Sequence, residues 1–118
     1  MNSPEPDAIP DFFPGELPRF TPGQCVEHRL YRYRGLIVDF DMHCTAGEEW
    51  YWSNASQPDP DQPWYHVLVD GSDALTYVAQ ENLAPENPQK ITHPLVAAYF
   101  EMDLDGHYQR NDEIWPSL

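Results

Sequence analysis

Two stretches decide the fold of this chain, Arg34-Gly-Leu-Ile-Val-Asp-Phe40 and Pro63-Trp-Tyr-His-Val-Leu-Val-Asp70. Both are dense in β-branched and aromatic residues, which is typical of strands. The segment Asp70-Gly71-Ser72-Asp73 predicts a hairpin turn, after which Leu75–Ala79 forms a strand that pairs back. Gly35, inside the first stretch, indicates a bulge or a close approach of another backbone.

Further strand signals lie on either side of these stretches. Pro22-Gly23-Gln24 is a turn, and it opens a first strand over Cys25–Leu30. A tight connection at residues 31–33 follows, and Glu81–Leu83 predicts a short last strand. Residues 41–62 form a long polar connection, a length that is usually functional or flexible. Several short strands with tight turns predict a mainly β fold, a small SH3-like, partly open barrel with one C-terminal helix.

The C-terminal helix is predicted from residue 92 onward. Thr92 is a candidate cap and Pro94 lies in the first turn. Apolar residues then recur at helical spacing, at Leu95, Val96, Tyr99, Phe100 and Met102. We expect one amphipathic helix that ends at Asp105-Gly106 and covers an open face or edge of the sheet. We expect the last twelve residues to be irregular, with Ile114 and Trp115 as anchors.

The N-terminal segment differs in composition. Residues 1–22 contain six prolines, which disfavour a regular helix or a central strand. They form either an extended arm, pinned by Phe12, Phe13, Leu17 and Phe20, or a leader without fixed structure. The chain therefore divides into a proline-rich acidic arm (1–22), a β-barrel core (23–83) and a C-terminal extension with the helix (84–118).

Composition and charge narrow the function class. The 118 residues include 20 acidic and six basic side chains, a net charge of −14. That balance opposes binding to phosphate backbones and favours docking onto basic protein surfaces. No apolar run is long enough to span a membrane, and the N-terminus does not resemble a signal peptide, so we expect a cytoplasmic protein. Cys25 and Cys44 are then expected to be free thiols.

The middle of the chain resembles the YccV-like family, also called the hemimethylated-DNA-binding or heat-shock protein Q family. The resemblance rests on Gly23-Gln24-x-Val26-x-His28, Tyr31-x-Tyr33-x-Gly35-x-Ile37-x-x-Phe40-Asp41, the block Pro63–Asp70, and Thr76–Leu83. The motif positions are Gly23, Val26, His28, Tyr33, Gly35, Pro63, Trp64, Tyr65, His66, Tyr77, Ala79, Glu81, Asn82 and Leu83.

The match extends through Ile91-x-His93-Pro94-x-Val96-x-x-Tyr99-Phe100, and is similar to the version of this domain at the C-terminus of a eukaryotic F-box protein. Here the domain is expected nearly alone, with no F-box before it. The resemblance implies a small barrel without catalytic activity, and two competing functions: binding of hemimethylated DNA, and modulation of an ATP-dependent protease in protein quality control. The acidic loop at 48–61 and the proline-rich arm depart from the simplest members.

One basic cluster is a candidate contact site. His28, Arg29, Arg32 and Arg34 lie on a predicted hairpin, where they could contact DNA phosphates or an acidic partner surface. The alternative is a solvated hairpin whose arginines balance Glu27 and Asp39. Three arginines are few beside modules that make 6–10 phosphate contacts.

Aromatic residues form the second candidate. Trp50, Tyr51 and Trp52 lie in the long polar loop, where aromatic side chains could anchor a protein partner. The alternative is that the tryptophans fold back onto the core. Alternation sends Tyr65, Val67 and Val69 to one side of their strand and Trp64, His66 and Leu68 to the other, and we expect one of these sets to be core.

No metal, cofactor or catalytic site is expected. Cys25, His28, His43, Cys44 and His66 lack the repeated ligand pairs of structural zinc sites. Histidine 66 is instead expected to hydrogen-bond within the fold, to Glu81. No nucleophile motif or phosphate-binding glycine loop is present.

The preferred hypothesis is a non-enzymatic YccV-like module that binds other proteins in quality control, with a protease or its substrates as partner. The alternative is a DNA-binding protein with a preference for hemimethylated sites, whose binding would be weak and salt-sensitive. The sequence carries no signal for an oligomeric state.

Overall fold

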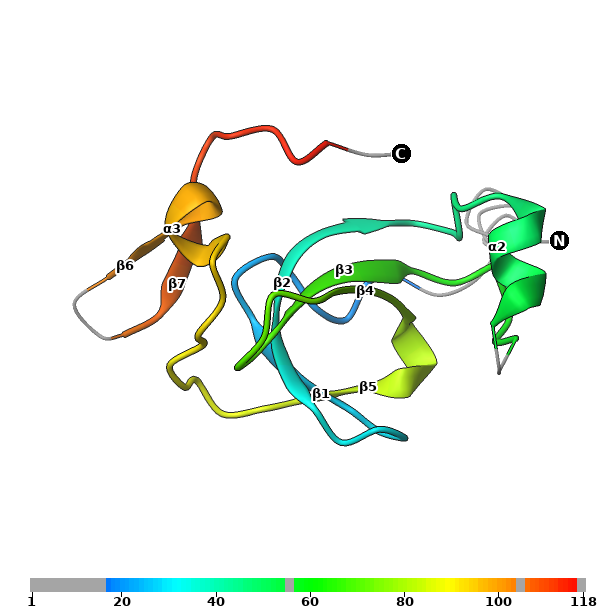
Figure 1. The fold of residues 1–118 in the computed structure, drawn as a ribbon, viewed down its shortest axis with the longest axis horizontal. Helices are drawn as coiled ribbons and strands as arrows, with labels where there is room; N and C mark the ends of the chain where they lie inside the picture. The colour runs from blue at the N-terminus through cyan, green and yellow to red at the C-terminus, as the bar shows by residue number, and fades with distance from the viewer. Residues whose placement is uncertain (1–16, 55–56, 104–105, 117–118) are drawn as a thin grey trace, which may run out of the picture.

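The computed structural model describes residues 17–54, 57–103 and 106–116. Its centre is a five-stranded antiparallel sheet in the order β4-β3-β2-β1-β5 (Figure 1). The strands are β1 (Cys25–His28), β2 (Arg34–Asp41), β3 (Trp64–Val69), β4 (Leu75–Ala79) and β5 (Leu83–Pro85). Among the described residues, two short α-helices, a 3-10 turn and a two-stranded sheet complete the fold, so the mainly β class is confirmed.

The strands follow the sequence pattern closely, with one shift. The strands expected at 34–40, 63–70 and 75–79 are present within one residue at either end, whereas the strand expected at 25–30 ends at His28, where the turn begins. The strand expected at Glu81–Leu83 is wrong in its position along the chain. A 3-10 turn occupies Gln80–Asn82, and the strand begins at Leu83. The turn brings the amide N–H of Gln80 to the carbonyl of Pro63 at 2.9 Å, and it redirects the chain to pair with β1.

Both faces of the sheet carry buried apolar residues. One face carries the Tyr65 cluster, which consists of Phe20, Val26, Ile37, Tyr65, Val67, Val78 and Leu83. The other carries the Leu68 cluster, which consists of Cys25, Leu36, Val38, Leu68, Ile91, Phe100 and Tyr108. Both alternating sets of β3 therefore contribute to the core, and Trp64 and Tyr65, on opposite faces, are both buried, since the C-terminal extension covers the second face.

Close backbone packing explains Gly35. A Cβ added there would lie 2.7 Å from the carbonyl oxygen of Leu68, on the neighbouring strand, and would also meet the Val67 side chain. The register shift of the β2–β3 pair falls between Ile37 and Asp39. Gly35 therefore marks a close approach and not the bulge.

The expected long C-terminal helix is wrong. Helix α3 spans only Val96–Tyr99, and the chain then forms β6 (Phe100–Met102), which pairs with β7 (Tyr108–Arg110). The apolar residues that suggested a helix serve a hairpin instead: Phe100 and Tyr108 are buried together, with ring centroids 6.1 Å apart. Because β7 lies in the last twelve residues, the expectation that these are irregular is also wrong.

Side chains of the extension attach it to the sheet. The Nε of Arg110 donates a hydrogen bond to the carbonyl of Val38, the residue between the two sides of the register shift, at 2.9 Å. The amide of Thr92 donates to Asp70 at 2.7 Å, and that of Ile91 donates to the Tyr108 hydroxyl at 2.9 Å. The second expected anchor, Trp115, packs on Tyr99, whereas Ile114 is exposed.

The start of the described chain is fixed to the sheet. Phe20 is buried against Tyr65, with ring centroids 5.5 Å apart. The amide of Arg19 donates to the Oε1 of Gln80 at 2.8 Å, and the Nε2 of Gln80 donates to the carbonyl of Leu17. The side chain of Leu17 is exposed, and the expected anchors at positions 12 and 13 lie outside the described residues.

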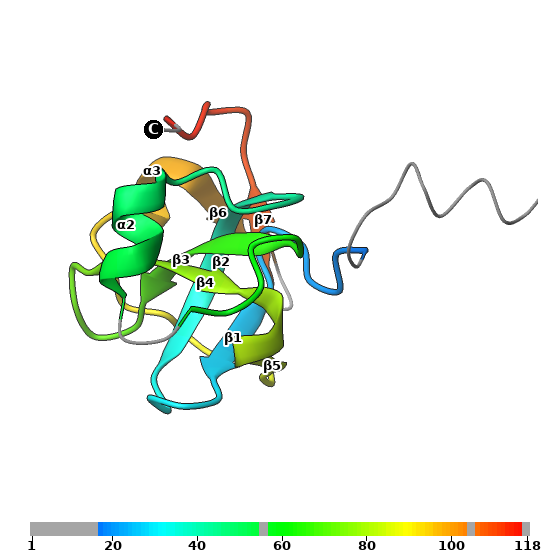
Figure 2. The same ribbon diagram turned by 90° about the vertical axis from the view of Figure 1, so that its right-hand side faces the viewer.

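Helix α2 (Glu48–Ser53) lies within the connection from β2 to β3, where the sequence pattern indicated only loop. It stands beside β3 and β4 at the opposite end of the sheet from α3 (Figures 1 and 2). Neither helix described is of a length or polarity that could cross a bilayer.

Candidate functional site

The turn between β1 and β2 is organised by His28. The side chain is buried, and its Nδ1 accepts hydrogen bonds from the amides of Leu30 and Tyr31, both at 3.1 Å. Its ring packs against Tyr31 and Tyr33. Burial lowers the pKa of His28, which favours the neutral form that these two bonds require. The histidine therefore shapes the turn and does not present a charge to a ligand.

The three hairpin arginines do not form one continuous basic face. The Nε of Arg32 lies 3.1 Å from Glu27, and the Nη2 of Arg34 lies 3.0 Å from Asp70. Arg34 also donates to the side chain of Gln89. The exposed Arg29 forms no ion pair with any described residue. Local carboxylates therefore compensate two of the three charges.

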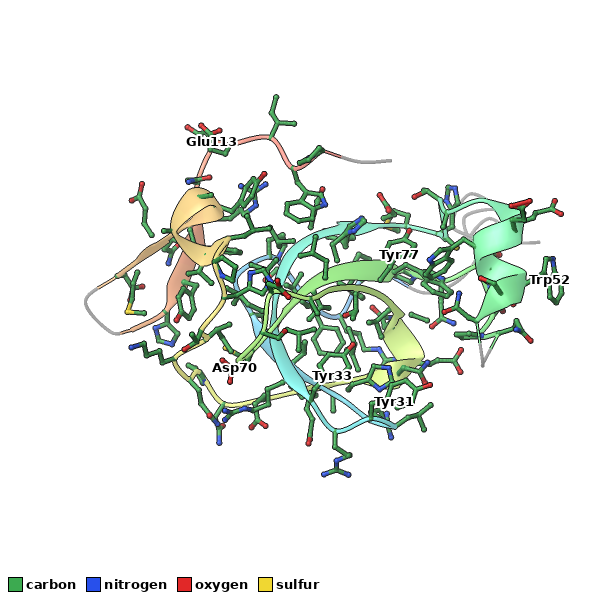
Figure 3. All side chains as sticks on the ribbon, in the orientation of Figure 1. Tyr31, Tyr33, Trp52, Asp70, Tyr77 and Glu113 are labelled. Atoms are coloured by element: carbon green, nitrogen blue, oxygen red, sulfur yellow. The ribbon has the colours of Figure 1, made fainter. Side chains whose placement is uncertain are left out.

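Aromatic rings form a row across one face of the sheet, which we call the aromatic row. It lies on the same face as the Leu68 cluster, since Trp64 pairs with Ala79 and His66 with Tyr77 on that side of the β3–β4 register. Figure 3 shows Tyr77 at the end of the sheet that faces α2. The row runs from helix α2 to the C-terminal extension through Trp50, Trp64, Tyr77, His66, Trp115 and Tyr99, with consecutive ring centroids 4.6–6.0 Å apart.

The spacing of these rings shows that they are packed against one another. Trp50 meets Trp64 and Tyr77 edge to face, at 6.0 and 5.6 Å. Trp64 is only 3% exposed, and its indole N–H has no hydrogen-bond partner among the described residues. Packing therefore holds its ring, and Trp50, Trp64 and Tyr77 are all within ring-contact distance of one another.

Asp41 is a polar centre beside the row. Its Oδ2 accepts hydrogen bonds from the Tyr77 hydroxyl at 2.7 Å and the Thr45 hydroxyl at 3.0 Å, and it lies 3.3 Å from the Nε2 of His66. Burial, together with the neighbouring carboxylate, raises the pKa of Tyr77 well above its ordinary value. The expected partner of His66, Glu81, is wrong, because Glu81 accepts a hydrogen bond from Gln62 instead.

Helix α2 divides its aromatic residues between the fold and the surface. Trp50 joins the aromatic row and is 37% exposed, whereas Trp52 is 65% exposed. Tyr51 donates a hydrogen bond to the carbonyl of Pro58 at 2.9 Å and meets Trp52 edge to face. Figure 3 shows Trp52 projecting away from the rest of the molecule. The three aromatic residues expected to contact a partner therefore differ in their surroundings. Trp50 packs on the sheet, Tyr51 hydrogen-bonds within the loop, and Trp52 is exposed.

The cysteines and histidines of the zinc alternative lie in different surroundings. The buried Cys25 thiol donates to the carbonyl of Gln89 at 3.7 Å, and burial raises the pKa of the half-buried Cys44 thiol. His43 is exposed, and His28 and His66 have the partners given above. Within residues 17–54, 57–103 and 106–116, no three His, Cys, Asp or Glu side chains are grouped to bind a metal ion.

The other motif positions hold the fold. Gly23 has a φ of +97°, and a Cβ there would lie 2.5 Å from the carbonyl oxygen of Tyr108. The Tyr33 hydroxyl lies 2.8 Å from that of Thr76, which links the β1–β2 turn to β4. The buried positions are Val26, Pro63, Tyr65, Ala79 and Leu83. The carbonyl of Asn82 accepts the amide of Arg29 at 2.8 Å.

Four polar residues that the sequence analysis did not single out organise the structure: Asp41, Gln62, Gln80 and Asp70. Gln80 is fully buried, which is unusual for glutamine. Each of them has at least one partner far along the chain, such as Tyr77 for Asp41 and Glu81 for Gln62, and local spacing could not have indicated those contacts. The only sequence signal was the position of Asp41, Gln80 and Asp70 within or at the ends of the motif blocks.

Comparisons with known proteins agree with this arrangement. Residues 18–107 match the family model described as "Hemimethylated DNA-binding protein YccV like". The chain is 38% identical over 100 residues to the F-box only protein 21 of Pongo abelii, Mus musculus and Homo sapiens. That alignment covers 80% of this chain and 16% of each relative, so the chain spans about a sixth of their length. The match covers the sheet, α2 and most of the extension, and we conclude that the chain belongs to the YccV-like family.

Proposed function

We propose that this chain is a non-enzymatic binding module that binds other proteins in cytoplasmic protein quality control, with a protease or its substrates as partner. We further propose that its curved sheet is a partly open SH3-like barrel, flanked by the proline-rich arm (1–22), which contributes Phe20 to the core, and by the C-terminal extension (84–118), which contributes Ile91, Phe100 and Tyr108. The observation that carries the proposal is the presentation of Trp52 on helix α2, which Trp50 anchors to the sheet.

The chemistry around Trp52 suits a protein contact. A tryptophan supplies a large contact area with few rotatable bonds, so ordering it on binding costs little entropy. Glu48 and Glu49, in the first turn of the same helix, are exposed. Their charge would steer the helix toward a basic partner surface and accelerate the encounter. The proposed partner surface is therefore basic and has an apolar pocket for one indole ring.

DNA binding, the property in the family description, remains the second candidate. It is favoured by the arginines of the β1–β2 hairpin, and Arg29 is the most available of them. It is opposed by the ion pairs of Arg32 and Arg34 and by the net charge of −14. With three phosphate contacts at most, the slope of log affinity against log salt would be about −3.

Affinity capture from the source extract tests the proposal, with wild type, Trp52→Ala and Ile114→Ala compared quantitatively. Ile114 is 86% exposed and serves as the matched control for loss of an exposed apolar side chain. We expect partners that Trp52→Ala loses, that Ile114→Ala retains, and that include a protease or its substrates. Partners that all three proteins capture equally would rule out this surface.

Titration of labelled duplexes that are unmethylated, hemimethylated or fully methylated tests the second candidate. We expect weak binding that physiological salt abolishes and that methylation does not change. Tight, hemimethyl-selective binding at physiological salt would overturn the proposal and establish the DNA function.

A further inference from the structure

A groove of about 890 Å³ lies on a part of the molecule that shares no residue with helix α2. Three arginines line it, Arg19, Arg29 and Arg32, and Glu27 is the one acidic residue in its described lining. Half of the chain's six basic residues therefore lie along one groove, in a protein with 20 acidic residues. Within the described lining, Glu27 is ion-paired with Arg32 at 3.1 Å, whereas the exposed Arg29 forms no ion pair with a described residue, so Arg29 gives the groove an exposed positive charge.

The apolar part of the lining comes from Phe20, Leu83 and Pro85. Phe20 and Leu83 belong to the Tyr65 cluster and are buried, so they are held firmly by the core. Pro85 is the last residue of β5 and is exposed. The groove thus has the core beneath it and exposed arginine side chains along it, and its volume is in the range of sites that hold a small ligand or a few residues of peptide.

Strand β5, all three residues of which line the groove, also carries hydrogen-bond acceptors on its open edge. It is an edge strand whose one neighbour in the sheet is β1. The Arg29 N–H donates to the carbonyl of Asn82 at 2.8 Å, and the Glu86 N–H donates to the carbonyl of Cys25 at 3.0 Å. These two bonds show which residues of β5 direct their backbone groups toward β1. Since backbone groups alternate in direction along an antiparallel strand, Ala84 faces β1, and the carbonyls of Leu83 and Pro85 face the open edge.

This edge offers acceptors without donors. The amide of Leu83 donates to the carbonyl of Gln80, and Pro85 has no amide N–H. Two carbonyls two residues apart match the spacing at which an extended peptide presents N–H groups toward a neighbouring strand. The proline also prevents the edge from pairing reciprocally with its own copy, which is a known protection of edge strands.

We propose that the groove beside β5 binds an extended acidic segment of a partner protein, through pairing with the Leu83 and Pro85 carbonyls and an ion pair with Arg29. Strand addition of this kind takes its affinity from the main chain and its specificity from alternate side chains. A nucleic-acid backbone fits less well, because phosphates bring no N–H donor and two carbonyl oxygens would face their negative charge. The inference goes beyond the proposed function, since it concerns a second surface and a partner of opposite charge.

Fluorescence polarisation with a labelled peptide of sequence Gly-Glu-Val-Asp-Val-Glu-Gly tests this proposal in the full chain. The variants are Arg29→Glu and, as the charge-matched control, Lys90→Glu, because Lys90 is exposed and does not line the groove. Arg29 is exposed and uses only its backbone amide in the fold, so Arg29→Glu is expected to melt like wild type. We expect saturable binding that Arg29→Glu weakens at least tenfold and Lys90→Glu less than about twofold.

Two further probes separate the parts of the proposal. Two peptides, one N-methylated at its odd-numbered residues and one at its even-numbered residues, test the backbone pairing. We expect one of the two to bind at least tenfold more weakly than the unmodified peptide. A hemimethylated duplex tests the nucleic-acid occupant, for which we expect no Arg29-dependent binding at physiological salt. The proposal is overturned by the absence of saturable peptide binding, by equal effects of Arg29→Glu and Lys90→Glu, by indifference to both N-methylations, or by tighter Arg29-dependent binding of the duplex.

The outcome is independent of the Trp52 surface. Trp52→Ala is expected to bind the acidic peptide like wild type, whereas Arg29→Glu is expected to retain the partners that depend on Trp52. Failure of one proposal therefore leaves the other measurable.

Discussion

At the scale of single residues, the most informative position is His28. Its place in a basic sequence cluster suggested a contact with phosphate or with an acidic partner. In the structure it accepts two backbone amides and packs between Tyr31 and Tyr33, so its role is to fix the β1–β2 turn. The arginines around it are then displayed by a turn of defined shape.

We expect His28→Leu to lower the free energy of unfolding by about 2 kcal/mol, because it leaves the amides of Leu30 and Tyr31 without their acceptor. His28→Asn, whose side-chain oxygen can replace the Nδ1, is expected to lose less. Urea denaturation of both variants at pH 7.5 measures the difference. Equal losses would show that ring packing, and not the acceptor, matters.

The lowered pKa of His28 also gives its contribution a pH dependence. The folded state holds this histidine neutral to a lower pH than the unfolded state, whose pKa is about 6.5. Stabilisation by His28 is therefore complete above about pH 6.5 and decreases as the pH falls below it. We expect the stability difference between wild type and His28→Asn to shrink between pH 7.5 and 5.5, measured by urea denaturation. A constant difference would contradict this assignment.

Gly35 is a second single position that the fold depends on, here because the neighbouring backbone lies too close for a larger side chain. We expect Gly35→Ala to destabilise the fold by about 1–3 kcal/mol, because the added methyl group would meet the carbonyl of Leu68 and neither strand can move freely. Gly47→Ala is the control, since no described atom lies within 4 Å of its added Cβ. Thermal melts of the two variants measure the contrast, and a melt of Gly35→Ala at the wild-type temperature would refute the close approach.

At the scale of elements, α2 shows how a short helix is held. Six residues are too few for a helix that is stable by itself. Trp50, packed on Trp64 and Tyr77, attaches the helix to the sheet. The Tyr51 hydroxyl donates a hydrogen bond to the carbonyl of Pro58, which ties the helix to the loop that follows it. The helix can thus present Trp52 in a fixed direction only because tertiary contacts stabilise it.

We expect Trp50→Ala to lower the free energy of unfolding by about 2 kcal/mol through the loss of two aromatic contacts. Trp52→Ala, at a largely exposed position, is expected to change it by less than about 0.5 kcal/mol. Chemical denaturation followed by circular dichroism measures both. If Trp52→Ala were the more destabilising change, Trp52 would be a structural residue and its role as a contact would be excluded.

At the scale of the whole molecule, the sheet and the C-terminal extension form one structure. The extension supplies Ile91, Phe100 and Tyr108 to the Leu68 cluster, and Arg110 satisfies the carbonyl of Val38 at the register shift. Without it, Leu36, Val38 and Leu68 would face water. The extension is therefore part of the core in energetic terms.

We expect a chain truncated after Lys90 to be unfolded or aggregated, because it would expose the apolar side chains of the Leu68 cluster on β2 and β3. A chain that ends at Pro116 is the control. Size-exclusion chromatography and circular dichroism measure the outcome. A monomeric truncated chain with a cooperative melt would show that the extension is an independent addition.

Local pattern was sufficient for the strands at 34–41, 64–69 and 75–79 and for the β3–β4 turn, because alternation, β-branching and a glycine turn are properties of neighbouring residues. It failed at 92–102, where the apolar spacing suited a helix, whereas the structure pairs Phe100–Met102 with Tyr108–Arg110. The motif blocks were equally sufficient for the family.

The candidate surfaces depended on contacts between distant parts of the chain. Whether Trp50 or Trp52 is exposed, and whether Arg32 and Arg34 are paired, follows from partners such as Trp64 and Asp70. The groove beside β5 exists only where Arg19, β1 and β5 meet. Adjacent residues of one type look alike in a sequence, and only the three-dimensional arrangement determines which are buried, which are neutralised and which remain available to a partner.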